Sequence, residues 1–350
     1  MKIRKMFVAF SVSLLISGNV WASSASSFTT LYTFGDSLSD VGDSDSAVMS
    51  LYKLLGDNCD PLHQCGLLGP YSHGRLADGP VASEQLAATL FPGGVNPMNF
   101  RSYAVAGANT GDSNSGFNLG GIINLPGMKQ EVDNYLSDSK GTADPNALYF
   151  LWGGANDYFT GDPAAAAAHN LAGYVSTLAS AGAKHFLVPN LPDLSLTPDQ
   201  LHKPEAQAFS LAFNSALATE LGNLHLPGAG IASFDVYSFF NGVVQDPAKF
   251  GFTNVDSPCV SPGDISSCGN PEGHVFWDNI HPTSRADGFI AGAFASAVPE
   301  PETVSMFIAG LIVLVFAGGA GRRARPGYAP RYARTSGYLP RDASHGPLWS

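Results

Sequence analysis

The sequence is poor in charge, and most of the charge that it has is of one sign. Only 13% of its 350 residues are charged, and the acids outnumber the bases by 29 to 18. The segment between residues 23 and 298 contains nine of the basic and 26 of the acidic residues, a net charge of −17. Because such a surface repels nucleic acid and anionic membranes, we expect no nucleic-acid partner. The low charge and the 45% of hydrophobic residues also exclude a disordered or coiled-coil protein.

Long hydrophobic runs are lacking except near the two ends. At the start, Lys2, Arg4 and Lys5 precede the apolar run "MFVAFSVSLLI", and "VWA" (20–22) supplies small residues at the offsets that a signal peptidase requires. A buried N-terminal helix is the alternative, but it would not require all three features together. We therefore expect a signal peptide at residues 1–22, which signal peptidase removes on export.

The second run, Val304 to Ala320, is uncharged and about the shortest length that spans a bilayer. The arginine cluster at 322–325 would hold its far end on the cytoplasmic side. With "VPEP" just ahead of it, residues 299–325 resemble a PEP-CTERM sorting signal of Gram-negative bacteria. The resemblance implies transient membrane contact through this helix, cleavage by an exosortase-type enzyme, a place at the cell surface or in the extracellular matrix, and a tail at 326–350 that is disordered or removed. A plain C-terminal anchor is the alternative.

Cysteine is also scarce. Cys59, Cys65, Cys259 and Cys268 have no zinc-binding spacing, and an even count in an exported chain favours disulfides. These four cysteines allow three disulfide pairings. The local one, Cys59–Cys65 and Cys259–Cys268, closes two short loops, each worth about 2 to 3 kcal/mol in the chain-entropy model.

Between residues 28 and 298, apolar runs of strand length alternate with amphipathic segments. We expect strands at 29–34, 101–106, 147–152, 184–189 and 230–236, and helices at 81–90, 128–138, 163–182, 205–221 and 284–297. Strands that alternate with helices favour a parallel sheet covered on both faces. No repeat or linker divides this segment, so the sequence predicts one α/β domain at residues 28–298.

Small polar residues follow each of the first three expected strands: "GDSL" (35–38), "GANT" (107–110) and "GGAND" (153–157). Each motif alone is ordinary turn chemistry. In an open parallel sheet, however, ligands bind beyond the carboxyl ends of the strands, so all three motifs are expected at one edge. They could supply a serine nucleophile and, from glycine N–H groups and an asparagine amide, donors for a developing oxyanion.

A serine at this edge also needs an imidazole base, and the base needs a carboxylate to orient it. Four Asp-x-x-His pairs are available: 60/63, 199/202, 278/281 and 342/345. The last lies beyond the apolar tail, and the first lies in the expected Cys59–Cys65 loop. We interpret Asp199 as a carboxylate that caps a helix after Pro198.

The pair Asp278/His281 has a different context. It follows the apolar residues 275–277, and Pro282 biases His281 away from helical backbone. Ser284-x-x-Asp287 then predicts a capping box that opens the last helix. This context favours Asp278 and His281 as the acid and the base.

The segments "FGDSLSDVGD", "YAVAGANT", "LWGGANDYF" and "VFWDNIHPT" resemble the four sequence blocks of the GDSL, or SGNH, family of lipases and esterases. They follow the family's order and span nearly the whole body. The resemblance implies a three-layer α/β/α, flavodoxin-like fold with a central parallel sheet. It also implies that Ser37 is the nucleophile and, through its N–H, an oxyanion donor. Gly107 and Asn156 would be the other donors, and Asp278 and His281 the acid and base.

These observations predict a secreted serine esterase or lipase that hydrolyses carboxylic esters through an acyl-enzyme and needs no cofactor. The ester could be a lipid, a short-chain ester or an acetylated glycan. The loop "DVGDSDS" contains Asp40, Asp43 and Asp45 but lacks an EF-hand pattern, so we expect solvated turn acids and no metal. The alternatives are an O-acetyl esterase or acyltransferase acting on exopolysaccharide, and a non-catalytic surface module that binds glycan or lipid.

Overall fold

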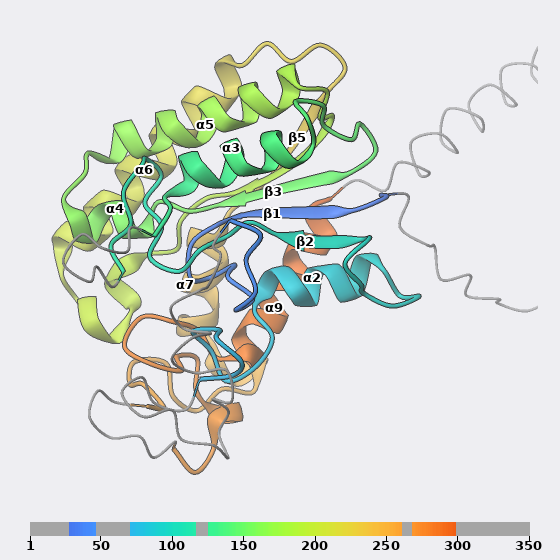
Figure 1. Ribbon diagram of the computed structural model, residues 1–350. Helices are drawn as coiled ribbons and strands as arrows, with labels where there is room; N and C mark the ends of the chain where they lie inside the picture. Colours follow the sequence, from blue (N-terminus) through green and yellow to red (C-terminus); the bar gives the residue numbers. More distant parts are fainter. Residues whose placement is uncertain (1–27, 47–70, 117–124, 261–267, 299–350) are drawn as a thin grey trace, which may run out of the picture. The chain divides into compact units, whose positions relative to one another are not determined.

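The computed structural model describes residues 28–46, 71–116, 125–260 and 268–298, which lie in one α/β unit (Figure 1). Its five strands are parallel and have the spatial order β2-β1-β3-β4-β5. They are β1 (Leu31–Gly35), β2 (Phe100–Ser102), β3 (Leu148–Trp152), β4 (His185–Pro189) and β5 (Gly230–Phe234). The order reverses beside β1, and open sheets of this kind bind ligands at the reversal, outside the carboxyl ends of β1 and β3.

Helices cover both faces of the sheet. They are α2 (Ala82–Leu90), α3 (Met128–Asp138), α4 (Ala155–Thr160), α5 (Ala164–Ser180), α6 (Pro204–Asn223), α7 (Val236–Gln245), α8 (Pro247–Phe250) and α9 (Ser284–Ala297). Short 3₁₀ helices occur at η1 (Leu194–Leu196), η2 (Pro198–Gln200) and η3 (Pro271–Gly273). In Figure 1, α3, α5 and α6 lie on one side of the strands and α2, α7 and α9 on the other. The predicted three-layer α/β/α fold is confirmed.

The strands separate the core into two layers because successive side chains point to opposite faces. On β3, Tyr149 and Leu151 pack under α3, α5 and α6. Leu148, Phe150 and Trp152 pack on the side of α2, α7 and α9. All five side chains of β3 are buried, as expected of a central parallel strand.

Most predicted elements occur where the sequence places them, with four corrections. The strand predicted at 101–106 is much shorter, because β2 covers only Phe100–Ser102. The run at 230–236 is not all strand, because the Asp235 carboxylate accepts from Ser238 N and caps α7. Helix α9 is capped by Thr283, whose side chain accepts from Ala286 N, so the predicted Ser284 capping box is wrong. Asp199 does not cap a long helix: it lies in η2, and α6 begins at Pro204.

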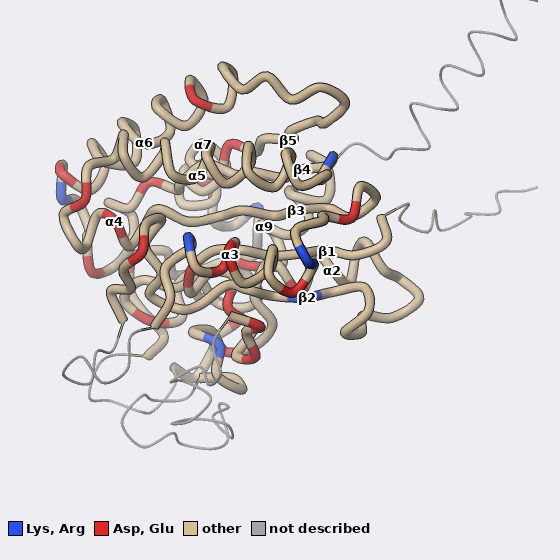
Figure 2. Tube along the Cα trace, turned by 45° about the horizontal axis from the view of Figure 1, so that its top comes forward, with Lys and Arg blue, Asp and Glu red and all other residues tan. Residues whose placement is uncertain are grey.

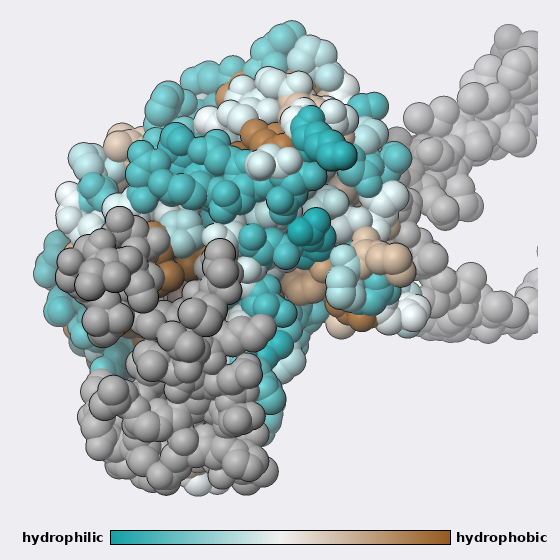
Figure 3. All heavy atoms as spheres, in the orientation of Figure 1, coloured by the Kyte–Doolittle hydropathy of each residue, from teal (hydrophilic) through white to brown (hydrophobic). Residues whose placement is uncertain are grey.

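Several predictions fall on residues outside those that the structure describes: the signal peptide at 1–22, the Cys59–Cys65 pair, the sorting signal at 299–325 and the tail at 326–350. Among the described helices, none has the length and apolar character needed to cross a membrane. Acidic residues outnumber basic ones along the described trace (Figure 2), and the face in Figure 3 is largely hydrophilic over α3 and α5.

Candidate active site

The turn after β1 carries Ser37. Asp36 forms this turn: its carbonyl accepts from Ser39 N and Asp40 N, and its Oδ1 accepts from Leu38 N. Gly35 is required just before it, since a Cβ there would lie 2.1 Å from the carbonyl oxygen of Trp152 on β3. The close approach of β1 and β3 therefore fixes the position of the turn that carries Ser37 at the end of β1.

The loop that carries Asp278 and His281 is a tight turn closed on itself. Trp277 N donates to His281 O at 2.8 Å, and Thr283 N donates to Val275 O at 2.9 Å. Within the turn, Asp278 Oδ1 accepts from Ile280 N at 2.8 Å and from His281 N at 2.7 Å. The Asp-x-x-His spacing thus folds the carboxylate against the backbone of its own histidine.

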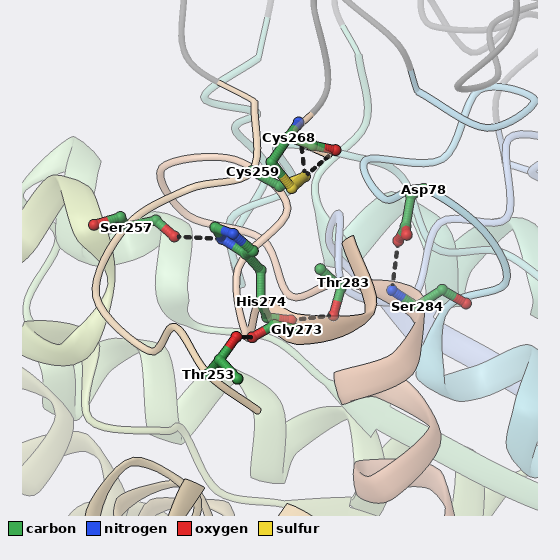
Figure 4. Close-up of a disulfide and its surroundings, with 9 residues drawn as sticks. All are labelled: Asp78, Thr253, Ser257, Cys259, Cys268, Gly273, His274, Thr283 and Ser284. Carbon is green, nitrogen blue, oxygen red and sulfur yellow. Dashed lines mark hydrogen bonds between the residues drawn. A yellow bond between two sulfur atoms is a disulfide. The ribbon is translucent and has the colours of Figure 1, made fainter. Parts of the chain in front are cut away.

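A disulfide supports this turn from outside (Figure 4). Cys259 and Cys268 are bonded, which confirms this half of the predicted pairing. Cys259 N donates to Phe276 O at 3.1 Å, and Val260 N donates to Trp277 O at 2.7 Å. The disulfide ring is therefore attached to the two residues that precede Asp278.

Ser37, His281 and Asp278 form a continuous hydrogen-bonded relay. His281 Nε2 lies 2.8 Å from Ser37 Oγ, and His281 Nδ1 lies 2.8 Å from Asp278 Oδ2. Burial lowers the pKa of the His281 imidazole, but the charge and hydrogen bond of Asp278 outweigh it and raise that pKa above 6.5. Burial raises the pKa of Asp278, yet His281 brings it below its ordinary value. The pair therefore favours an aspartate anion and an imidazole that accepts a proton readily.

Three groups that could bind an oxyanion line the same cavity as Ser37 and His281: the N–H groups of Ser37 and Gly107 and the Asn156 amide. Neither N–H donates to an acceptor among the described residues. Gly107 has φ +82°, and a Cβ there would lie 2.5 Å from Asn114 Oδ1, so glycine is required. Asn156 Nδ2 donates one hydrogen to Ala108 O at 3.0 Å and has a second hydrogen to offer.

Three buried carboxylates fix the loop that carries Gly107. Glu131 of α3 accepts from Val105 N at 3.1 Å, Asp40 accepts from Ala106 N at 2.8 Å, and Asp157 of α4 accepts from Thr110 N at 3.0 Å. Glu131 also accepts from Gly35 N at 2.8 Å, so one side chain joins the Gly107 loop to the end of β1. The expectation that Asp40 is a solvated turn acid is wrong, because only 1% of its surface is exposed.

These buried acids have an electrostatic cost. Burial raises the pKa of Asp36 and Asp40 to about 6 and that of Glu131 well above 4.5, although backbone N–H donors oppose the shift in each case. Their arrangement satisfies backbone donors at the edge of the site but does not resemble a metal site. Within the described ranges, no group of three or more His, Cys, Asp or Glu could hold a metal ion.

Sequence reasoning missed Tyr71 as a member of this site. Its hydroxyl donates to Asp278 Oδ2 at 2.7 Å, across 207 residues of sequence. No local pattern predicts such a contact. The competing pair Asp199/His202 is not joined by any hydrogen bond or ion pair within the described part of the chain, and Asp199 bonds Gln200 instead.

The structure thus brings Ser37, Gly107, Asn156 and His281 to one cavity beyond the carboxyl ends of the strands, and Asp278 contacts the far side of the His281 ring. The cavity measures about 200 Å³, and Trp152, Val236, Phe240, Phe276 and Ile290 form most of its deeper wall. A nucleophile, a base and oxyanion donors beside an apolar recess can perform acyl transfer.

Comparison with known proteins gives consistent matches along the chain. Residues 31–294 match the family GDSL-like Lipase/Acylhydrolase. A GDSL esterase/lipase of Arabidopsis thaliana is 25% identical over 347 residues, covering 83% of this chain and 96% of the plant protein. A phosphatidylcholine-sterol acyltransferase of Aeromonas hydrophila is 27% identical and covers 75% of this chain and 88% of its own. A crystal structure from the lipolytic G-D-S-L family, from Veillonella parvula, covers 76% of this chain and 95% of its own with a TM-score of 0.39 and 15% identity.

Proposed function

We propose that this protein cleaves carboxylic esters through Ser37, His281 and Asp278. The chain belongs to the GDSL-like lipase/acylhydrolase family and is therefore an ester hydrolase. The observation that carries the proposal is the relay in which His281 Nε2 lies 2.8 Å from Ser37 Oγ while Nδ1 faces Asp278. A serine hydroxyl becomes a nucleophile at neutral pH when an oriented imidazole can take its proton.

In the first half-reaction, Ser37 Oγ attacks the ester carbonyl carbon and its proton moves to His281 Nε2. The Asp278 carboxylate stabilises the imidazolium that forms. The N–H groups of Ser37 and Gly107 and the free hydrogen of the Asn156 amide bind the oxyanion of the tetrahedral intermediate. When the intermediate collapses, His281 gives the proton to the departing alkoxide, and an acyl-Ser37 ester remains.

In the second half-reaction, His281 takes a proton from water, which attacks the acyl-Ser37 carbonyl. Collapse of this intermediate returns the proton to Ser37 Oγ and releases the carboxylic acid. No step requires a cofactor or a metal ion.

Labelling with a fluorophosphonate tests the proposal directly. The purified protein should react with one equivalent of probe at Ser37, and a Ser37→Ala variant should not react. A Ser39→Ala variant is a matched control, because Ser39 lies two residues away and is fully buried. Labelling that survives in Ser37→Ala, or that is absent from the wild type, would reject the assignment.

An acyltransferase is the second candidate function. The Aeromonas hydrophila relative is named as an acyltransferase, and the same acyl-enzyme can pass its acyl group to an alcohol. An O-acetyl esterase or acyltransferase acting on exopolysaccharide would use the same residues. Product analysis of one ester with and without a glycan acceptor separates hydrolysis from transfer.

We also propose that the protein is exported by its N-terminal signal and sorted to the cell surface by residues 299–325 with transient membrane contact. The Cys259–Cys268 disulfide supports export, because disulfides persist in oxidising compartments. Mature protein from the native host should begin after Ala22 and end near residues 299–301. Mass spectrometry that finds an intact chain through Ser350 at the cell surface would contradict the sorting proposal and favour a plain anchor.

A further inference from the structure

The cavity beside Ser37 extends along the carboxyl edge of the sheet, from the β2 end toward β4 and β5. At the β2 end it is bordered by Gly107, Ser115 and Gly116, which present backbone and hydroxyl groups. Toward β4 and β5 it is bordered by Pro192 and Leu194, after β4, and by the first turns of α7. Ser37, at the end of β1, lies between these two ends. The cavity is therefore polar on one side of the nucleophile and apolar on the other.

We call the apolar side the deep arm, defined by Trp152, Val236, Phe240, Phe276 and Ile290. Each of these side chains is at most 4% exposed, so the deep arm lies inside the layer formed by α7 and α9. By contrast, Phe159 near Asn156 is 37% exposed. The arm is a recess that enters the core, whereas on the polar side Ser115 is exposed within the part of the chain that the structure describes.

Two polar side chains on the border of the deep arm, Asp193 and Thr197, already have hydrogen-bond partners within the protein. Asp193 accepts from Ser195 N at 3.0 Å and from Tyr237 Oη at 3.0 Å. Thr197 Oγ1 donates to Leu194 O at 2.9 Å. The recess therefore offers a ligand apolar contact and little hydrogen bonding, which suits a hydrocarbon chain and not a sugar.

The order of events in catalysis decides which part of an ester enters a closed recess. The alcohol must leave before water can attack, so it needs a path to solvent. The acyl group stays bonded to Ser37 between the two half-reactions and needs no exit until the end. A recess walled by buried side chains thus fits the acyl chain, and the polar side fits the alcohol.

The volume of the cavity limits the length of that chain. An apolar cavity of about 150 Å³ is large enough to hold benzene, which has six carbons. The whole cavity here, its polar side included, measures about 200 Å³, so this volume is an upper limit for the deep arm. We propose, on the basis of the serine esterase function above, that the deep arm is an acyl-binding site and that the preferred substrates are esters of straight-chain acids of at most about eight carbons.

Two ester series test this site in the wild-type protein. With a constant 4-nitrophenol leaving group, kcat/KM should rise about fourfold per added methylene from acetate to hexanoate, because a buried methylene contributes about 0.8 kcal/mol. It should level off or fall beyond octanoate. With a constant acetyl group, lengthening the alcohol should change kcat/KM less than twofold per methylene. A flat acyl series, or a steep alcohol series, would overturn the proposal.

Two substitutions should move the preference in opposite directions. Ile290→Phe adds bulk to the arm and should lower the octanoate-to-acetate ratio of kcat/KM about tenfold. Phe240→Ala enlarges the arm and should move the optimum to decanoate or longer. Leu211→Phe is the control, because it adds similar bulk on α6 at a side chain that is 50% exposed and outside the cavity. An unchanged chain-length profile in both folded variants would exclude the deep arm as the acyl site.

The outcomes separate this proposal from the proposed function. If Ser37 is not labelled by a fluorophosphonate and no ester is cleaved, the serine esterase mechanism fails. If Ser37 is labelled and acetate is cleaved as well as octanoate, the mechanism stands and only the acyl site is rejected. Even if the Ile290→Phe and Phe240→Ala variants do not fold, the two ester series on the wild-type protein still test the acyl-binding site.

Discussion

Tyr71 Oη and His281 Nδ1 share one carboxylate oxygen, Oδ2 of Asp278, at 2.7 and 2.8 Å. The tyrosine therefore competes with the imidazole for the charge of Asp278. Replacing Tyr71 with Phe removes a hydrogen bond to a charged group, and we expect kcat to fall about tenfold. The carboxylate becomes more basic, so the acid limb of the kcat/KM profile should move to higher pH.

A second tyrosine provides the control for that experiment. Tyr103 Oη donates to Asp138 Oδ2 at 2.9 Å, away from the cavity. Tyr103→Phe also deletes a tyrosine–aspartate hydrogen bond, but it should leave the pH profile as in the wild type. An equal shift in both variants would mean that Tyr71 acts only through the fold.

The Asp-x-x-His pairs give a test of the base. His281→Asn should lower kcat by at least about 10³-fold, since Ser37 loses its proton acceptor. His202→Asn should retain most activity, and asparagine suits position 202 because His202 has a φ of +62°. The measurement is kcat on a 4-nitrophenyl ester, with circular dichroism to verify the fold. Equal losses in the two variants would remove His281 from the role of base.

Asn156→Ala should lower kcat by about 10²- to 10³-fold with little change in KM, because an oxyanion donor acts in the transition state. Asn170→Ala is the matched control. Asn170 also donates an amide hydrogen to the same loop, at Thr110 Oγ1, but does not border the cavity. A change confined to KM in Asn156→Ala would make it a substrate-binding residue instead.

The folded protein should lose stability as the pH rises from about 5.5 to 8. Burial raises the pKa of Asp36 and Asp40 to about 6, above that of the unfolded chain. The stability that they contribute is complete below pH about 4 and is lost as the pH rises through about 6. The raised pKa of His281 acts in the same direction, above about 6.5.

Thermal unfolding at constant ionic strength measures this effect. We expect the melting temperature to fall on the order of 5 °C across that range. Asp40→Asn should flatten the dependence, whereas Asp133→Asn, at an exposed position on α3, should not. A wild-type melting temperature that rises with pH between 5.5 and 8 would contradict the pKa assignments.

Much of the fold could be predicted from the sequence because its signals are local. Runs such as "LYFLW" are apolar throughout, and a strand that is buried on both faces requires this. Glycines and small polar residues follow the strands because the site lies at their carboxyl ends. The helices α4, α7 and α8 were not predicted, and for α7 the reason is that its capping residue, Asp235, lies within an apolar run.

The electrostatic support of the site could not be predicted in the same way. Glu131 lies in an amphipathic helix whose pattern does not distinguish an inward carboxylate from a surface one. Asp40 lies in an acidic loop that resembles a solvated turn. Both are buried against a segment distant in sequence, where the Glu131 carboxylate accepts from Val105 N and the Asp40 carboxylate accepts from Ala106 N. Tyr71 depends on a contact of the same long-range kind.

The separation of Ser37 from His281 by 244 residues affects the order in which the parts of the site are synthesised and assembled. Helix α9 holds the histidine turn by packing against α2, and Gln85 of α2 donates to Ser284 O at 2.7 Å. A ribosome therefore makes the nucleophile 244 residues before the base, so a nascent chain that has not yet reached His281 contains no complete relay. Contacts between such distant segments also form slowly, because the loop between them must close first. During refolding, the return of esterase activity should therefore report the docking of α9, after the sheet has formed.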